Sequence, residues 1–375
     1  MKKRLVSIIL AGVMILSLTA CGSGASEQNQ EAAPEEAAEE TDVAVEAEEA
    51  GDAEETAGSD KEYTIGYSMK TLQEERWQRE LECCQKYADE LGVNFVYQVA
   101  NNDSDLQISQ IENLITQGVD AILVTPVDSG ALSTVLKDAR DQGIKVIGYD
   151  QECEGVEYDA YVGYSAYEIG KQFSQMAIDA GVTKGNFVFL YGDSQSGTAV
   201  ENMKQGMWDT LQEYIDAGDI KVVMDQYCKD WSAESGLAHT ENAISTYGED
   251  IAAVICMNDG IANGAIQALT AAGMENKGIV VTGQDCELTA VQRIIAGTQT
   301  ATLYKDSDKL AQKVMNAAYA TITGGDIGTS DTIDIGGIVS PWVIADTVVV
   351  DKNTYQSVII DGGVFTEEEL AAKAE

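Results

Sequence analysis

The sequence predicts an α/β protein with two doubly wound lobes, each a mostly parallel sheet covered by helices. Short apolar runs alternate with amphipathic stretches from about residue 61 onward, as in parallel sheets with helices on both faces. This alternation occurs in two successive series. The chain from Lys61 to Glu375 also has over three hundred residues, which is more than one hydrophobic core usually serves. We therefore expect two lobes.

The first series predicts four strands and three helices. The expected strands are Thr64–Met69, Phe95–Val99, Ala121–Val124 and Val146–Tyr149, and the expected helices are Glu75–Leu91, Asp105–Thr116 and Ala131–Gln142. The second helix has apolar residues at helical spacing, namely Ile108, Ile111, Leu114 and Ile115. Gly118 is expected to end it.

The second series repeats the rhythm. Its expected strands are Phe187–Leu190, Lys221–Gln226, Ala253–Met257, Ile279–Thr282 and Thr300–Tyr304, and its helices include Ala199–Tyr214 and Gly260–Ala272. In such sheets, ligands bind beyond the carboxyl ends of the strands. Functional residues are therefore sought where these strands end.

The start of the chain predicts a secretion signal that ends at a lipidation cysteine. Basic residues 2–4 precede an apolar run, Leu5–Ala20, which is shorter than the ~20 residues of a membrane-spanning helix. Small residues precede Cys21, as signal cleavage requires. We expect residues 1–20 to be a signal peptide and Cys21 to carry a lipid that anchors the protein outside the cytoplasm. An uncleaved anchor helix is the alternative.

Residues 21–60 contain no Lys or Arg and consist mostly of acidic and small residues, so we expect a disordered tether. This segment carries much of the net charge of −40. The remainder is also acidic and has no basic stripe, which argues against a nucleic-acid or anionic-lipid partner.

The cysteine and histidine patterns favour neither a disulfide scaffold nor a metal site. Six cysteines remain besides Cys21 and show no CxxC spacing, so we interpret them as free thiols: Cys83, Cys84, Cys153, Cys228, Cys256 and Cys286. His239 is the only histidine and lacks a paired ligand at helical spacing. Neither a P-loop nor a GxGxxG motif opens a helix after a strand, so no cofactor is expected.

Polar and aromatic residues gather at the predicted strand ends. They are Arg76, Trp77, Asp150, Gln151, Asn258, Asp259, Gln284, Asp285 and Lys305, with Trp231 in the loop after the Lys221–Gln226 strand. Aromatic faces suit the C–H face of a ring, and charged groups suit hydroxyls. A polyhydroxylated ring fits this set. Singly, Trp77 could be a core residue, Asp150 or Asn258 could cap a helix, and Lys305 could be solvated.

Several ordered motifs carry a family resemblance from about Tyr63 to Leu370. They include residues 75–78 (ERWQ), 107–120 (QISQIENLITQGVD), 143–150 (GIKVIGYD), 258–259 (ND), 264–269 (GAIQAL), 283–285 (GQD), 296–300 (AGTQT) and 304–305 (YK). With them the chain resembles the type I periplasmic sugar-binding proteins of ABC transporters, most closely the D-xylose-binding proteins. The resemblance implies two lobes joined by a three-segment hinge.

For the site, the resemblance implies that Arg76, Asp150, Asn258, Asp285 and Lys305 hydrogen-bond a sugar that Trp77 and Trp231 sandwich. Two positions depart from the xylose-binding pattern. Gln151 stands where those proteins have arginine, and Thr198 where they have asparagine. Both changes alter the donors and acceptors of the pocket, so they leave the identity of the sugar open.

The resemblance also implies an organisation and a mechanism. One lobe would comprise residues 61–165 and about 303–340, and the other residues 166–302 and about 341–375, with crossings near 164–168, 299–305 and 340–347. A monosaccharide, either xylose-like or a related pentose or hexose, would close the hinge, and an ABC permease would accept it. We expect a monomer without enzymatic activity.

Three other functions are alternatives to this one. The closed form could instead be presented to a sensor kinase or chemoreceptor. A secreted glycosidase would also use paired carboxylates, and it would be recognised by cleavage of a glycosidic bond. A repressor of the lactose type would need a helix-turn-helix headpiece where this chain has a lipoprotein leader.

Overall fold

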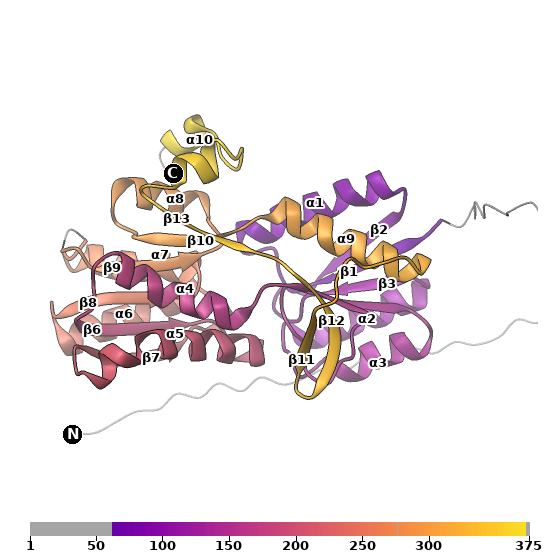
Figure 1. The fold of residues 1–375 in the computed structure, drawn as a ribbon, viewed down its shortest axis with the longest axis horizontal. Helices are drawn as coiled ribbons and strands as arrows, with labels where there is room; N and C mark the ends of the chain where they lie inside the picture. Colours follow the sequence, from indigo (N-terminus) through magenta and orange to yellow (C-terminus); the bar gives the residue numbers. More distant parts are fainter. Residues whose placement is uncertain (1–61, 276, 373–375) are drawn as a thin grey trace, which may run out of the picture. The chain divides into compact units, whose positions relative to one another are not determined.

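The computed structural model describes residues 62–275 and 277–372 (Figure 1). They lie in one compact unit, Ser59–Glu375. The expected signal peptide (1–20), Cys21 and the tether (21–60) lie outside the described residues. Within the described ranges, no helix combines the length and the hydrophobicity needed to cross a membrane.

Lobe 1 is built on a seven-stranded sheet of order β11-β12-β5-β4-β3-β1-β2, in which only β11 runs antiparallel to its neighbour. Its strands are β1 (Thr64–Met69), β2 (Asn94–Val99), β3 (Ala121–Val124), β4 (Lys145–Tyr149), β5 (Ala160–Gly163), β11 (Thr332–Ile335) and β12 (Ile338–Ile344). Its helices are α1 (Glu75–Leu91), α2 (Ser104–Gln117), α3 (Ser133–Asp141) and α9 (Ser307–Thr323).

Lobe 2 is built on a six-stranded sheet of order β13-β10-β9-β8-β6-β7, in which β13 is antiparallel to β10. Its strands are β6 (Gly185–Tyr191), β7 (Ile220–Tyr227), β8 (Ile251–Cys256), β9 (Val280–Gln284), β10 (Ala301–Lys305) and β13 (Thr347–Asp351). Its longer helices are α4 (Ala166–Asp179), α5 (Thr198–Asp216), α6 (Ala233–Tyr247), α7 (Asp259–Ala271) and α8 (Leu288–Ala296). Its short helical segments are η1 (Ser194–Ser196), η2 (Lys229–Trp231), η3 (Gln356–Ile360) and α10 (Glu367–Ala371).

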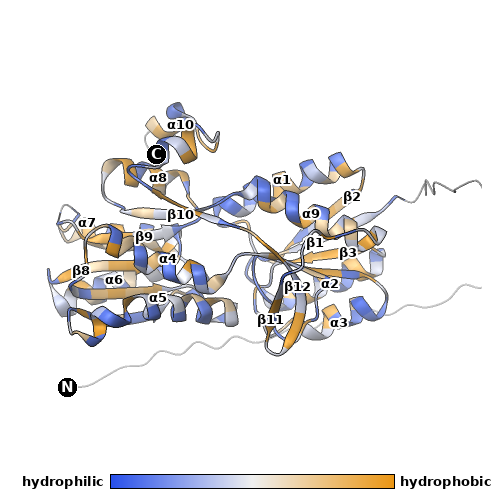
Figure 2. Ribbon diagram, viewed as in Figure 1, coloured by the Kyte–Doolittle hydropathy of each residue, from blue (hydrophilic) through white to orange (hydrophobic). Residues whose placement is uncertain are grey.

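The alternation of side chains along the strands explains why helices cover both faces of the lobe 1 sheet. In β3, Leu123 packs into one hydrophobic cluster with residues of α1 and α9, whereas Ile122 and Val124 pack into another with residues of α2 and α3. Successive side chains point to opposite faces of a strand, so both faces of this sheet are covered. Figure 2 shows hydrophobic residues along the central strands and mixed colours on the surrounding helices.

The predicted fold class is confirmed. The strands Thr64–Met69 and Ala121–Val124 and the helix Glu75–Leu91 have the predicted bounds, and the other predicted elements differ by one or two residues at one or both ends. The prediction did not include β5, β11, β12 or β13. The six described cysteines are free thiols, as interpreted, and all but the half-buried Cys83 are buried.

The chain passes between the two sheets three times, at residues 164–165, at Asp306 and at residues 345–346. The strands shift two of the expected lobe boundaries. β10 continues to Lys305 in lobe 2 because it pairs with β9 and β13. β12 continues to Ile344 in lobe 1 because it pairs with β5.

Candidate functional site

A cavity lies between the two lobes, at the carboxyl ends of strands from both sheets. Such strand ends are where open α/β sheets place their ligands. Eight of the nine predicted site residues line it: Arg76, Trp77, Asp150, Gln151, Trp231, Asn258, Asp285 and Lys305. The other lining residues are Lys70, Glu74, Glu152, Tyr161, Tyr164, Ala166, Ile169, Ala199, Met203 and Gln284.

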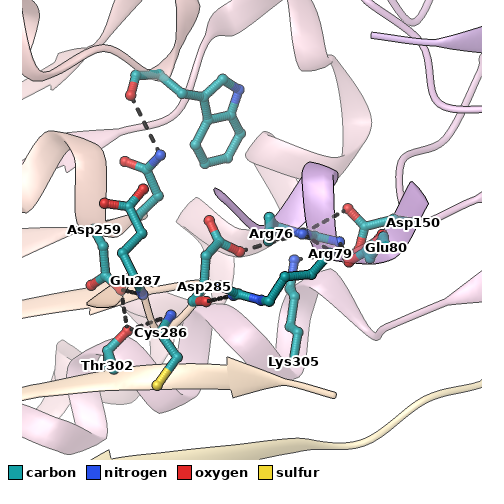
Figure 3. Close-up of polar contacts among 12 residues, drawn as sticks. Arg76, Arg79, Glu80, Asp150, Asp259, Asp285, Cys286, Glu287, Thr302 and Lys305 are labelled. Atoms are coloured by element: carbon teal, nitrogen blue, oxygen red, sulfur yellow. Dashed lines mark hydrogen bonds and ion pairs between the residues drawn. The ribbon is translucent and has the colours of Figure 1, made fainter. Parts of the chain in front are cut away.

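Arg76 is the centre of the polar contacts in this cavity (Figure 3). It lies in the first turn of α1, and its side chain is 4% exposed. Nη2 donates to Glu80 Oε1 at 2.6 Å, one helical turn later. Nη1 lies 3.2 Å from Asp150 Oδ2 in lobe 1 and 3.4 Å from Asp285 Oδ1 in lobe 2. The guanidinium group of Arg76 thus contacts carboxylates of both lobes.

Asp150 is held between two cations. It follows β4 in a left-handed conformation (φ 63°), and its Oδ1 lies 3.3 Å from Lys305 Nζ at the end of β10. Burial alone would raise the pKa of Asp150, but Arg76 and Lys305 outweigh it, so the pKa is lowered. Asp150 is therefore a carboxylate at neutral pH.

The two tryptophans approach the cavity from opposite lobes, and both are almost fully buried. Trp77 belongs to α1, and the guanidinium carbon of Arg76 lies 4.1 Å from the centre of its ring. Trp231 follows β7, and Lys70 Nζ of lobe 1 lies 5.5 Å from its ring centre. Each ring offers an apolar face next to a cation, an arrangement that suits a ligand with both C–H and hydroxyl groups.

The backbone at Trp231 is held in an uncommon conformation. Asp230 and Trp231 both have positive φ angles, 54° and 56°. Trp231 Nε1 donates to Ser196 Oγ at 3.1 Å, and the backbone oxygen of Trp231 accepts from Asn258 Nδ2 at 3.4 Å. A Cβ at Gly192 would come within 2.2 Å of the indole, so only glycine leaves room for this ring. Such local strain is common in ligand sites.

Asn258 has two roles. It is the N-cap of α7, where its Oδ1 accepts from the amide of Ile261 at 2.8 Å, and it also lines the cavity. The capping interpretation and the site interpretation therefore both apply to this residue.

Beneath the cavity, Asp259 forms a buried support. Its carboxylate accepts from Gln299 Nε2 at 2.7 Å, from Thr302 Oγ1 at 2.8 Å and from the amide of Glu287 at 3.0 Å. Burial raises the pKa of Asp259 to about 7. These bonds tie α7 to β10 and to the loop that carries Asp285, so they fix the floor of the cavity in lobe 2.

Thr198 is the one predicted site residue that does not line this cavity. Gly197 turns the chain with a φ of 55°, and α5 begins with Thr198. The Thr198 hydroxyl then donates to Glu154 Oε1 of lobe 1 at 2.7 Å, whereas Ala199 faces the cavity. The methyl group of Ala199 therefore lines the cavity where the hydroxyl of Thr198 was expected.

Three charged lining residues were absent from the predicted strand-end set: Lys70, Glu74 and Glu152. Gln284 belongs to that set, although the family resemblance gave it no role, and it lines the cavity at the end of β9. Lys70 directly follows β1, so the rule of strand ends could have included it. Glu74 and Glu152 lie in loops beyond strand ends, where the sequence gives no such signal.

Several of these polar groups lack a partner within the described part of the chain. Glu74 Oε2, Gln151 Oε1 and Gln284 Oε1 are buried without a hydrogen bond. Burial and, to a smaller extent, the charge of Glu154 raise the pKa of Glu152 to about 7. Buried polar groups are normally paired. These atoms therefore mark where a ligand with hydroxyl groups would bind.

Comparisons with known proteins show which proteins this chain resembles. A family described as "Periplasmic binding protein domain" matches residues 65–326. The D-xylose-binding periplasmic protein of Escherichia coli is 36% identical over 310 residues, which cover 83% of this chain and 93% of that protein. A multiple sugar-binding periplasmic receptor of Rhizobium radiobacter is 30% identical over 325 residues, covering 82% and 92%. The structure of a solute-binding protein from Clostridium phytofermentans with bound β-D-glucose has 28% sequence identity and a TM-score of 0.76. The match covers 82% of this chain and 99% of that one.

Proposed function

The chain belongs to the periplasmic binding proteins, and from that premise we propose that it captures a monosaccharide between its two lobes. The observation that carries this proposal is the composition of the cavity. It combines Trp77 and Trp231 from opposite lobes with the bridge of Arg76 between Asp150 and Asp285. Xylose, glucose and related pentoses or hexoses are the candidate ligands.

The unpartnered groups of the cavity fit hydroxyl groups. A sugar hydroxyl donates one hydrogen bond and accepts others, so it can satisfy both kinds of group at once. Gln151 and Gln284 each have a free acceptor, and the Lys70 ammonium offers donors. Gln151 is neutral where xylose-binding relatives are expected to have arginine, so the proposal covers a class of sugar and not one sugar.

Ligand capture is proposed to occur by closure about the three crossings. A sugar that touches residues of both lobes binds the closed arrangement better than an open one, and this difference shifts the equilibrium towards closure. Lys305 lies directly before the crossing at Asp306 and also contacts Asp150. Tyr164, which lies in the first crossing, also lines the cavity, and Lys305 Nζ lies 5.0 Å from the centre of its ring. The site is thus connected to two of the three crossings.

The proposed partner is an ABC permease that accepts the sugar from the closed protein. Periplasmic binding proteins work outside the cytoplasm, and the relatives of Escherichia coli and Rhizobium radiobacter are sugar-binding proteins, not enzymes. We propose that a lipid on Cys21 anchors the chain, that residues 21–60 act as a tether, and that the protein is a monomer without catalytic activity.

The proposal is tested by the melting temperature of residues 61–375 with pentoses, hexoses, disaccharides, polyols and nucleosides. A ligand at a hundred times its Kd stabilises by about 2.7 kcal/mol, which raises the Tm by several degrees. We expect a rise with one or a few monosaccharides and no turnover of any of them. A panel in which no sugar raises the Tm would refute the proposal.

Sugar affinity is expected to fall as pH rises from about 5 to 7 and to level off above, because of Glu152. Opening the cavity would hydrate this carboxyl and return its pKa towards 4.5, whereas burial in the closed form raises the pKa to about 7. At pH values between these two pKa values, Glu152 is protonated in the closed form and ionised in the open form. Rising pH therefore opposes closure, by at most about tenfold in Kd per pH unit.

Isothermal titration calorimetry between pH 5 and 8 checks this prediction. Glu152→Gln should flatten the profile, because an amide does not titrate. Glu157→Gln is the matched control, since Glu157 is exposed and paired with Arg140 away from the cavity. A slope that persists unchanged in Glu152→Gln would assign the effect to another group.

A further inference from the structure

Glu75 and Arg79, one helical turn apart on α1, contact lobe 2 without lining the cavity. Glu75 Oε2 accepts a hydrogen bond from the amide of Leu288 at 3.0 Å. Arg79 Nη2 donates to the backbone oxygen of Asp285 at 3.0 Å. The partners lie at the start of α8 and directly before it. Separation of the lobes would break both hydrogen bonds.

The contact of Glu75 completes the end of a helix in the other lobe. The first amides of a helix have no partner within the helix, and the N-cap residue of α8, Glu287, supplies no side-chain hydrogen bond. Glu75 accepts from the first of these amides across the interface. Its negative charge also lies at the positive end of the α8 dipole, which is favourable. In the closed arrangement, lobe 1 therefore caps a helix of lobe 2.

Arg79 fixes the backbone of a cavity residue. Asp285 has a φ of 94°, and its carboxylate faces Arg76 while its backbone oxygen accepts from Arg79 (Figure 3). The guanidinium carbon of Arg79 also lies 5.6 Å from the ring centre of Phe365, in the segment that follows β13. Arg79 thus meets lobe 2 at two points while its side chain remains 24% exposed.

We propose that Glu75 and Arg79 are positioning residues that form an interlobe latch, which sets affinity for any bound monosaccharide without touching it. The inference rests on the proposed function only in taking the ligand to be a sugar. The apparent affinity equals the intrinsic affinity multiplied by the fraction of molecules in the binding-competent state, so a smaller fraction means weaker binding. Contacts that form only on closure raise that fraction equally for every ligand, whereas contacts to the ligand discriminate between ligands.

The first test measures the Kd of two monosaccharides for Glu75→Ala and Arg79→Gln. Each variant is expected to raise both Kd values by the same factor, about 3- to 10-fold, as for the loss of one hydrogen bond. The ratio of the two Kd values should stay constant, and both sugars should dissociate faster. Unchanged Kd values, or a change for one sugar alone, would overturn the latch.

Lys86→Gln is the matched control for this test. Lys86 also projects from α1, but its ion pair at 2.7 Å is with Asp308 of α9, within lobe 1. Its loss removes a charged contact of the same helix without changing the interface between the lobes. We expect Lys86→Gln to bind both sugars like the parent protein.

The second test needs no ligand. Single-molecule energy transfer between dyes at the exposed positions Lys137 in lobe 1 and Lys184 in lobe 2 reports the fraction of closed molecules. Arg79→Gln should lower this fraction relative to Lys86→Gln, and equal fractions would overturn the latch. If the parent protein bound no sugar, the proposed function would fail, whereas this comparison would still decide on the latch.

Discussion

Asp150→Asn is expected to weaken monosaccharide binding about 100-fold or more, the largest single effect in this site. Asp150 accepts contacts from Arg76 Nη1 at 3.2 Å and from Lys305 Nζ at 3.3 Å, and all three side chains are at most 4% exposed. Removing one partner of a buried ion pair costs about 3–5 kcal/mol, because it leaves the other charge buried and unpaired. Closure over a sugar would then bury the Lys305 ammonium without its carboxylate, whereas Arg76 would keep its contacts with Glu80 and Asp285.

Isothermal titration calorimetry with the sugar identified by the thermal panel measures this loss. Asp308→Asn is the control, because Asp308 forms a half-exposed ion pair with Lys86 outside the cavity. Surface pairs of this kind contribute little, so its affinity should match the parent. If folded Asp150→Asn bound within a few-fold of the parent, Asp150 would not hold the ligand or its cations.

Trp231→Ala is expected to weaken binding about 30-fold, or about 2 kcal/mol, because a buried aromatic anchor is lost from a cavity that excludes water. The indole is 6% exposed, and its Nε1 is fixed by Ser196. The alanine variant keeps neither the flat apolar face nor this hydrogen bond. Affinities of the two proteins for the same sugar measure the loss.

Trp208→Ala separates an effect on binding from an effect on stability. Trp208 is a partly buried tryptophan of the same lobe, packed edge-on against Phe189 and bonded to the Tyr191 hydroxyl at 2.9 Å. It does not line the cavity. We expect Trp208→Ala to lower the Tm and leave the Kd unchanged. Equal losses of affinity in both variants would mean that Trp231 acts through stability alone.

The fold was predictable where structure is determined locally. Apolar runs of strand length and amphipathic helices recur along the chain, so β1 and α1 could be placed by their own residues. β12 and β13 could not be, because each takes its position from a partner distant in sequence, β5 or β10. A residue of β12, Val339, is 58% exposed, so apolar character along this strand does not report burial.

The site was predictable to the extent that strand ends meet at one edge of a sheet. This rule placed Asp150, Asn258 and Asp285 around the cavity, and the family resemblance added Thr198. Thr198 instead lies at the start of α5, where its hydroxyl contacts Glu154, a contact between distant segments that the sequence does not specify. Glu152 was not predicted as a site residue because it lies in an irregular loop, whose path depends on tertiary contacts.

The interleaving of the two lobes bears on the order in which the chain folds. β5 pairs with β12, where Tyr161 lies opposite Trp342, and β10 pairs with β13, the last strand of the described chain. Neither sheet can therefore be completed from its N-terminal portion as the polypeptide emerges. Pairing of such distant segments is slow because loop closure must precede it. Both sheets therefore stay incomplete until the C-terminal segment that contains β12 and β13 has been synthesised.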